Sequence, residues 1–276
     1  MLKTRVITAT VLLAVFLPIL FLLPPIYINA LFLVMIILAA WEWSRLIAPG
    51  ATRAALIYAG LCFIAIAALL FFSNVDIDIA LLLLAMVFWI VGAPLIMSRG
   101  TQLTLSKWQF FLAVLGLIVL PATWFALVFL REMGLLWLLT AMALVWVADI
   151  GAYFIGKAFG RRRLAPQLSP GKTVEGALGG IVLCCLFATL CALYLPPTAT
   201  IFGAFAVSWG WLPMFLLVIS LTALSIVGDL FESQLKRLSG VKDSSHLLPG
   251  HGGVLDRIDA LLPTMPIVVL LVGLLK

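Results

Sequence analysis

Residues 134–157 read GLLWLLTAMALVWVADIGAYFIGK, an apolar run that is interrupted by one carboxylate, Asp149, and closed by Lys157. A helix needs about 20 mainly apolar residues to cross ~30 Å of hydrocarbon, so this run predicts a membrane-spanning helix. The whole chain agrees, because 65% of its 276 residues are hydrophobic, 10% are charged and its mean hydropathy is +1.27. Soluble globular domains are only roughly half apolar, so the composition excludes that class.

Similar apolar runs recur along the chain and predict an all-α, polytopic integral membrane protein with about nine transmembrane helices. The expected spans are 5–24, 26–46, 54–73, 78–97, 108–130, 134–156, 176–195, 210–235 and 258–275. The first run is expected to remain as an anchor, because no convincing signal-peptidase site follows it.

Basic residues predict the orientation, because they are favoured in short cytoplasmic loops. With a cytoplasmic N-terminus, only Arg131 and Lys276 lie on the outer side. The other basic residues then share the cytoplasmic face: Lys3, Arg5, Arg45, Arg53, Arg99, Lys107, Lys157, Arg161, Arg162, Arg163, Lys172, Lys236, Arg237, Lys242 and Arg257. The net charge of +6 then belongs to one face, which suits anionic headgroups or nucleotide phosphates, and no nucleic-acid-binding function is needed.

Polar side chains are concentrated in residues 228–259, in a chain that elsewhere avoids them. The segment first places five of them at i, i+3, i+4, i+7 and i+8, on one helical face: Asp229, Glu232, Ser233, Lys236 and Arg237. Carboxylates at the membrane edge are costly and usually face a wet cavity or a cation. A solvated helix end with an ion pair is the alternative, but it leaves Asp229 unexplained, because that residue closely follows a mostly apolar run.

The loop that follows reads PGHGG at 249–253, and glycines there allow backbone N–H groups to point at phosphoryl oxygens. Lys242 and Arg257 flank it. Asp256 and Asp259, at i and i+3, offer the carboxylate oxygens that Mg²⁺ takes together with substrate phosphates. The combination predicts a site for a metal and a phosphate. The histidines of this loop, His246 and His251, have loop hydrogen bonding as their alternative role.

A second polar cluster begins inside the predicted span 134–156. Asp149, Tyr153, Gly156 and Lys157 follow one helical face. An ionisable group at the depth of Asp149 indicates a functional site, with an ion pair to another helix as the structural alternative.

The next loop contains SPGKTVEG at 169–176, which is not a P-loop, because Pro166 stands where that motif requires glycine and no strand precedes it. Lys172 and Thr173 can still contact phosphate. Glu42 and Arg45, near the end of span 26–46, are explained by anchoring at the interface or by an i, i+3 pair.

Residues 233–259, SQLKRLSGVKDSSHLLPGHGGVLDRID, resemble the signature of the phosphatidate cytidylyltransferases, also called CDP-diacylglycerol synthases. The resemblance extends to 149–153 and 169–176. The first hundred residues carry no motif that supports it. Two positions depart from the pattern: Ile150 stands where a hydroxyl residue is common, which removes one hydrogen bond, and Gly171 stands where lysine is common, which removes one phosphate contact.

This resemblance implies that CTP and phosphatidate react to give CDP-diacylglycerol and pyrophosphate. The lipid phosphate would attack the α-phosphorus of CTP, so no covalent protein intermediate is needed, and positioning and charge neutralisation dominate. It implies Mg²⁺, with K⁺ as a candidate second cation, held by Asp229, Asp256 and Asp259. The chain then divides into an N-terminal transmembrane scaffold of about five helices, 1–130, and a C-terminal catalytic region, 131–276, with motif loops at 157–175 and 236–257.

The residues expected to be catalytic are Asp229, Lys236, Arg237, Lys242, Asp243, His251, Asp256, Arg257 and Asp259. Those expected to bind substrate are Asp149, Ser169, Lys172, Thr173, Ser233, Gly252 and Gly253. The expected partners are CTP, phosphatidate, membrane lipids and a second copy of the chain. The expected location is the cytoplasmic (inner) membrane, with the active site on the cytoplasmic face.

Three other functions fit the sequence less well. A CTP-dependent polyprenol or phytol kinase lacks the contiguous signature, and the spacing typical of CDP-alcohol phosphotransferases is not found. A transporter or channel usually spreads its charges across the bilayer midplane, whereas here they gather at one face.

Overall fold

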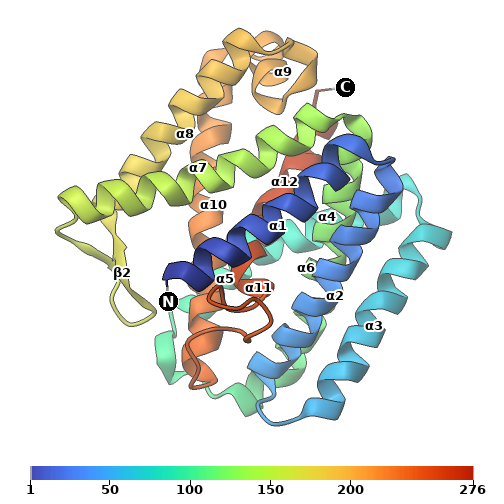
Figure 1. Ribbon diagram of the computed structural model, residues 1–276, viewed down its shortest axis with the longest axis vertical. Helices are drawn as coiled ribbons and strands as arrows, with labels where there is room; N and C mark the ends of the chain where they lie inside the picture. Colours follow the sequence, from blue (N-terminus) through green and yellow to red (C-terminus); the bar gives the residue numbers. More distant parts are fainter. Residues whose placement is uncertain (1, 276) are drawn as a thin grey trace.

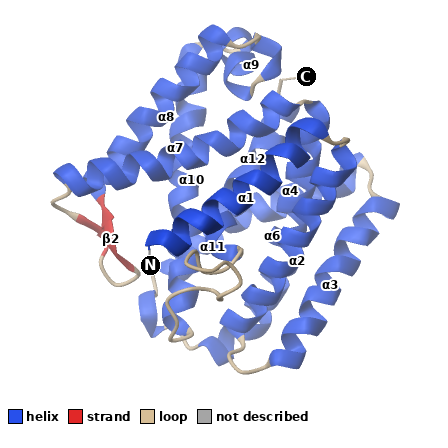
Figure 2. Ribbon diagram, viewed as in Figure 1, coloured by secondary structure: helices blue, strands red, loops and turns tan. Residues whose placement is uncertain are grey.

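Long helices run through nearly the whole chain in this computed structural model, which describes residues 2–275 (Figures 1 and 2). The side chains of 2–6, 9, 12 and 13 lie outside the described part of the chain, and so does Lys276; Lys3, Arg5 and Lys276, which contribute to the predicted orientation, are among them. The first half contains α1 Leu2–Leu22, α2 Pro25–Ile47, α3 Thr52–Phe72, α4 Val75–Val87, α5 Ala93–Met97 and α6 Leu105–Met133. The second half contains α7 Leu135–Phe159, α8 Val174–Tyr194, α9 Ile201–Ser208, α10 Trp211–Leu238, α11 Leu255–Ile258 and α12 Leu261–Gly273.

Local sequence explains where these helices begin and end. Pro25 occupies the first turn of α2, where the missing N–H costs nothing. Asn74 caps α4 by accepting from the N–H of Ile77 at 3.0 Å, and Thr173 caps α8 by accepting from the N–H of Gly176 at 3.1 Å. A π-helical turn, Phe88–Gly92, joins α4 to α5, so the two form one continuous rod.

The predicted count of nine spans is not confirmed. Seven helical segments among the described residues are long and apolar enough to cross a membrane: α2, α3, the α4–α5 rod, α6, α7, α8 and α10. Helix α12 has 13 residues, about 20 Å at 1.5 Å per residue, and most of its residues are buried in the protein. The run at 258–275 is therefore a short core helix in this structure. All-α character is confirmed, apart from one hairpin.

That hairpin lies inside the predicted motif loop 157–175. Strands β1 Arg163–Ala165 and β2 Ser169–Thr173 pair antiparallel, with Arg163 opposite Thr173 and Ala165 opposite Ser169. Its ends join α7 and α8, so it hangs from two adjacent helices (Figure 1).

Glycines let α7 and α8 approach closely. A Cβ added at Gly151 would stand 3.2 Å from the Cα of Gly180, and one at Gly156 would stand 3.4 Å from the Cα of Gly176. Small residues at such contacts let the backbones of membrane helices meet. The close pair holds the polar face of α7 beside the base of the hairpin.

The C-terminal half of α10 is fixed by an aromatic cluster. The ring of Phe231 lies 5.9 Å from Trp43, 5.3 Å from Phe88 and 5.6 Å from Trp89, centroid to centroid. Such offset and edge-on pairs add to the gain from burial. Asp229, two residues before Phe231, and Glu232, directly after it, are thereby held in place.

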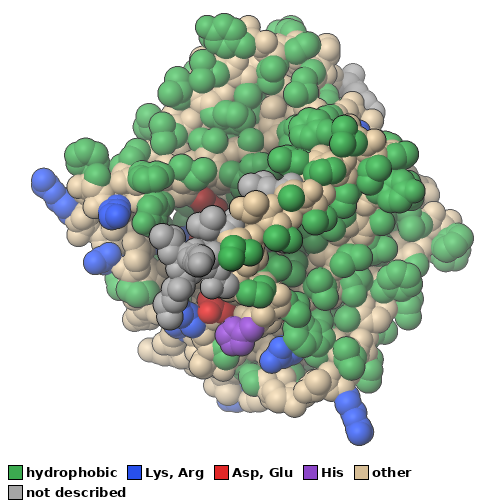
Figure 3. Space-filling model, in the orientation of Figure 1, with side chains coloured by type: hydrophobic (Ala, Val, Ile, Leu, Met, Phe, Trp, Pro, Cys, Tyr) green, Lys and Arg blue, Asp and Glu red, His purple; other side chains and the backbone are tan. Residues whose placement is uncertain are grey.

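The beginning of α1 lies near the hairpin and α11 (Figure 1). The hydroxyl of Thr8 in α1 donates to the carbonyl of Pro249 at 2.7 Å. Hydrophobic side chains cover most of the visible face, and Lys and Arg lie mainly at its lower and left edges (Figure 3).

Candidate active site

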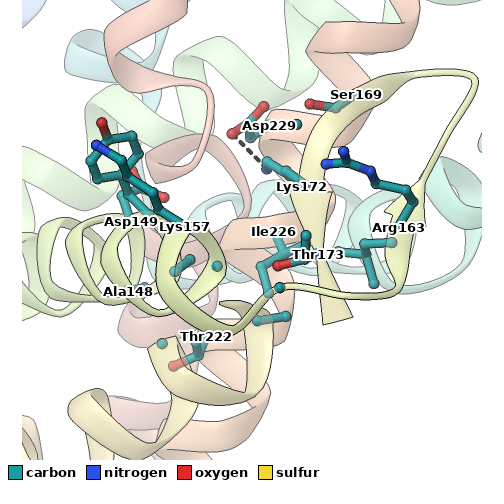
Figure 4. A pocket seen from close by; sticks show the side chains of 18 residues that line it. Ala148, Asp149, Lys157, Arg163, Ser169, Lys172, Thr173, Thr222, Ile226 and Asp229 are labelled. Carbon is teal, nitrogen blue, oxygen red and sulfur yellow. Dashed lines mark ion pairs between the residues drawn. The ribbon is translucent and has the colours of Figure 1, made fainter. Parts of the chain in front are cut away.

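A cavity of about 680 Å³ opens between α7, α8, α10 and the hairpin (Figure 4). Helix α7 lines it with its predicted polar face, and β2 contributes Ser169, Lys172 and Thr173. Helix α10 adds Thr222, Ile226 and Asp229. The predicted motif loop 157–175 therefore meets α10 at this cavity, whereas no residue of the predicted motif loop 236–257 lines it.

The predicted polar face of α7 is confirmed. Asp149, Tyr153, Gly156 and Lys157 all line the cavity. Ile150, which departs from the family pattern, is 56% exposed and lies outside the lining. The changed side chain at that position is therefore not part of the cavity wall.

An ion pair joins the hairpin to α10 across the cavity. Lys172 Nζ lies 2.5 Å from Asp229 Oδ2, and the two side chains are 24% and 30% exposed (Figure 4). The hydroxyl of Ser233 donates to the other oxygen of Asp229 at 3.2 Å. A partly exposed pair is a weak contributor to stability, so these groups remain accessible to a polar ligand.

A second network, of ion pairs and hydrogen bonds, joins α10 to α11 outside the cavity lining. Lys236 Nζ lies 2.5 Å from Glu232 Oε2 and 2.6 Å from Asp256 Oδ1. Asp256 Oδ2 accepts from the N–H and hydroxyl of Ser244 at 2.9 and 2.8 Å, and from the N–H of Gly253 at 2.7 Å. Burial alone would raise the pKa of Asp256, but Lys236 and these N–H donors hold it below its ordinary value.

Asp259 follows α11 and accepts from the N–H of Ala260 at 2.8 Å. Burial, and then the negative charge of Asp229, raise the pKa of Asp259 above its ordinary value. Two carboxylates that repel each other in this way form the environment that a hard cation relieves, and Mg²⁺ needs only one or two protein carboxylates beside substrate phosphates.

These oxygens fit the Mg²⁺ that the resemblance implies, with a difference among the three expected ligands. The negative charge of Asp229 acts unfavourably on Asp259, and a cation would relieve this, whereas both oxygens of Asp256 are already bonded to Lys236, Ser244 and Gly253. Within residues 2–275 no group of three or more His, Cys, Asp or Glu side chains forms a metal cage. The assignment of all three as ligands stays a prediction.

The remaining predicted residues lie around the loop rather than in the cavity. Arg237 Nε donates to the carbonyl of Leu168 at 3.4 Å, which links α10 to the hairpin. Arg257 donates to the carbonyl of His251 at 2.7 Å. Gly252 has φ of +81°, a conformation that favours glycine. Lys242 and Asp243 are exposed on the loop, and their roles stay predictions.

Of the two roles expected for Glu42 and Arg45, anchoring at the interface or an i, i+3 pair, the pair is wrong, and the burial of Glu42 does not fit an anchor. Glu42 is fully buried and faces the loop before α11, while the guanidinium of Arg45 lies 4.5 Å above the ring of Trp41. Sequence reasoning also missed Ser244 and Ser245, whose hydroxyls contact Glu42. The signal was available, because a carboxylate inside an apolar span requires compensating partners.

Comparison with known proteins identifies the family. The model of the cytidylyltransferase family matches residues 3–275. A phosphatidate cytidylyltransferase of Pseudomonas aeruginosa is 40% identical over 270 residues, which cover 97% of this chain and 95% of the relative. One of Bacillus subtilis is 38% identical over 183 residues, 63% of this chain and 64% of the relative. The chain therefore belongs to the cytidylyltransferase family of enzymes.

Proposed function

We propose that this enzyme transfers the cytidylyl group of CTP to phosphatidate, giving CDP-diacylglycerol and pyrophosphate. The names of the relatives support this reaction. The observation that carries it is the cavity, in which Lys157, Arg163 and Lys172 lie around the carboxylates Asp149 and Asp229 (Figure 4). Both a triphosphate and an anionic lipid headgroup need such cations.

In the proposed reaction an oxygen of the phosphatidate phosphate forms a bond to the α-phosphorus of CTP, and the bond from that phosphorus to the bridging oxygen of pyrophosphate breaks. The lipid phosphate is ionised and serves as nucleophile, so the protein forms no covalent intermediate. Lys172 and Lys157 hold phosphoryl oxygens and neutralise charge that builds up as pyrophosphate leaves. Mg²⁺, when bound by Asp229 and Asp259, would supply further neutralisation of the triphosphate.

The walls of the cavity suit a substrate that stays in the bilayer. Apolar side chains of Ala148, Ala152, Ala177 and Ile226 line it beside the polar groups. Phe154 on α7 and Leu178 on α8 are 64% and 58% exposed beside this region, where acyl chains can pack. The lipid headgroup can then reach the cations while its chains remain in hydrocarbon.

The proposal includes the side of the membrane on which the reaction occurs. The basic residues that flank the motif segments favour the cytoplasmic side of the inner membrane, where CTP is found. Arg161, Arg162 and Arg163 at the hairpin are exposed and contribute to this bias. A homodimer and a K⁺ ion stay predictions from the resemblance alone.

The purified chain in detergent micelles, incubated with Mg²⁺, α-labelled CTP and phosphatidate, tests the proposal. The expected result is labelled CDP-diacylglycerol, with pyrophosphate released in equal amount. A long-chain lipid alcohol in place of phosphatidate should give no product, and a phosphorylated alcohol with release of CDP would instead assign a lipid kinase. Solute flux in proteoliposomes without any CTP-dependent product would assign a transporter.

Lys172→Ala and Lys107→Ala form a matched pair for this assay. Lys107 is an exposed residue near the start of α6, and of the two lysines only Lys172 lines the cavity. Product formation should fall for Lys172→Ala alone. Equal activity of both variants would remove the cavity as the site of the reaction.

A further inference from the structure

Glu42 is a buried carboxylate with no part in the transfer chemistry itself. It lies in α2 and is 0% exposed. Among the described side chains no lysine, arginine or histidine forms an ion pair with it. A buried carboxylate without a cation is strongly unfavourable unless hydrogen-bond donors surround it.

Those donors come from the loop between α10 and α11. Oε1 of Glu42 accepts from the hydroxyl of Ser245 at 2.5 Å and from the N–H of Val254 at 3.0 Å. Oε2 accepts from the N–H of Leu255 at 2.6 Å and lies 3.1 Å from the hydroxyl of Ser244. Ser244 and Ser245 precede the glycine segment 249–253, and Val254 and Leu255 follow it. Hydrogen bonds to one carboxylate therefore hold the two ends of that segment together.

Ser244 connects Glu42 to the network at Asp256. Its hydroxyl lies 3.1 Å from Glu42 and 2.8 Å from Asp256 Oδ2, so its single proton is placed between two carboxylates. Asp256 in turn holds Lys236. A shift of Ser244 must therefore change the position of Asp256.

Gly253 shows how closely this region is packed. A Cβ at that position would stand 2.7 Å from Cδ of Glu42, closer than real Cβ atoms come to other heavy atoms. The second glycine of the Gly252–Gly253 pair thus makes room for the carboxylate. The sequence alone assigns Gly253 to substrate binding, and the contact with Glu42 gives it a packing role as well.

We infer that Glu42 is a positioning residue for the proposed cytidylyl transfer: it clasps the glycine loop and, through Ser244, sets the position of Asp256. This inference rests on the proposed function. The carboxylate matters, because each of its oxygens accepts from one backbone N–H; the amide of glutamine would turn its own N–H group toward the N–H of Val254 or of Leu255.

Glu42→Gln and Glu42→Asp test the clasp in the full-length chain, with Glu132→Gln as the matched control. Glu132 is an exposed carboxylate in the last turn of α6. Glu42→Gln should lower kcat by about ten- to a hundred-fold, as small misplacements of catalytic groups do, while KM for CTP changes little. Glu42→Asp keeps the charge on a shorter side chain and should recover part of kcat.

Hydrogen exchange gives a readout that does not depend on activity. In Glu42→Gln the amides of 244–255 should exchange faster, while those of α6, α7 and α8 exchange as in the unaltered chain. A general rise in exchange, with kcat falling only in proportion to the folded fraction, would make Glu42 a stability residue and overturn the inference. Normal kcat in folded Glu42→Gln would overturn it too.

A double-mutant cycle with Ser244→Ala tests the route from Glu42 to Asp256. If Glu42 acts through Ser244, the double variant should lose little more kcat than Glu42→Gln alone. Fully multiplicative losses would refute that route. Failure of the proposed function is distinguishable, because the unaltered chain would then form no CDP-diacylglycerol, whereas the exchange experiment would still report whether the clasp exists.

Discussion

Replacing Lys236 by methionine should destabilise the protein more than any other change of a single lysine in the site. The side chain of Lys236 is 13% exposed, and its partners Glu232 and Asp256 are 2% and 6% exposed. Its ammonium serves both carboxylates at once. Methionine keeps a similar apolar stem but leaves two buried carboxylates without their cation.

The size of the effect follows from this burial. Removing one partner of a buried ion pair costs about 3–5 kcal/mol. For a chain near this size each kcal/mol lowers the melting temperature by about 2–4 °C, so Lys236→Met should melt roughly 6–20 °C lower. Lys172→Met breaks a pair that is 24% and 30% exposed, and should cost about 1 kcal/mol or less.

Thermal unfolding of purified variants in one detergent measures both effects. Lys242→Met serves as control, because Lys242 is exposed on the loop. Adding Glu232→Gln to Lys236→Met should restore part of the lost stability, because it removes one unpaired charge. A melting temperature for Lys236→Met within about 2 °C of the unaltered chain would refute the reasoning, since it would show that the pairs with Glu232 and Asp256 add no net stability.

Three further changes give separate expectations. Lys172→Ala should raise KM for CTP or lower kcat while the melting temperature changes little, and unchanged steady-state kinetics would make Lys172 a structural residue. Asp256→Asn should abolish turnover in folded, membrane-inserted protein, as membrane extraction and a turnover assay with Mg²⁺ would show; near-normal activity would reject its assignment as a metal ligand. Gly253→Ala should cost about 1–3 kcal/mol by overpacking against Glu42, measured by thermal unfolding, and a melting temperature equal to that of the unaltered chain would show that the loop yields easily.

Much of the helical layout could be predicted from the sequence, because membrane-spanning helices consist of long runs of apolar residues. Each of the nine expected runs overlaps a helix of the structure, yet α12 is too short to span. Composition could not reveal this, because a buried core helix and a lipid-facing helix are equally apolar. The short helix α9 was missed for a similar reason: it continues an apolar stretch without a distinct period.

The site also has a part that local sequence predicts and a part that depends on contacts between distant segments. Asp149, Tyr153 and Lys157 share one face of α7, and that local spacing could be predicted. The contact of Lys172 with Asp229 joins two segments that were only expected to lie on the same side. The hairpin was missed because its strands are short and rich in arginine, proline and glycine.

The clasp at Glu42 lay beyond local reasoning. Its donors lie more than two hundred positions away along the chain, with separations of 202 to 213 residues. No periodicity links groups so distant. Only the rule that a buried carboxylate needs partners could have raised the question.

The clasp also limits how this chain can be cut or recombined. Glu42 belongs to α2, in the half expected to serve only as scaffold, whereas the groups it holds precede and begin α11. A fragment that starts at residue 131 would keep the cavity lining but leave the donors of Ser245, Val254 and Leu255 without their acceptor. In chimeras between relatives, α2 and the glycine loop should therefore come from the same parent protein.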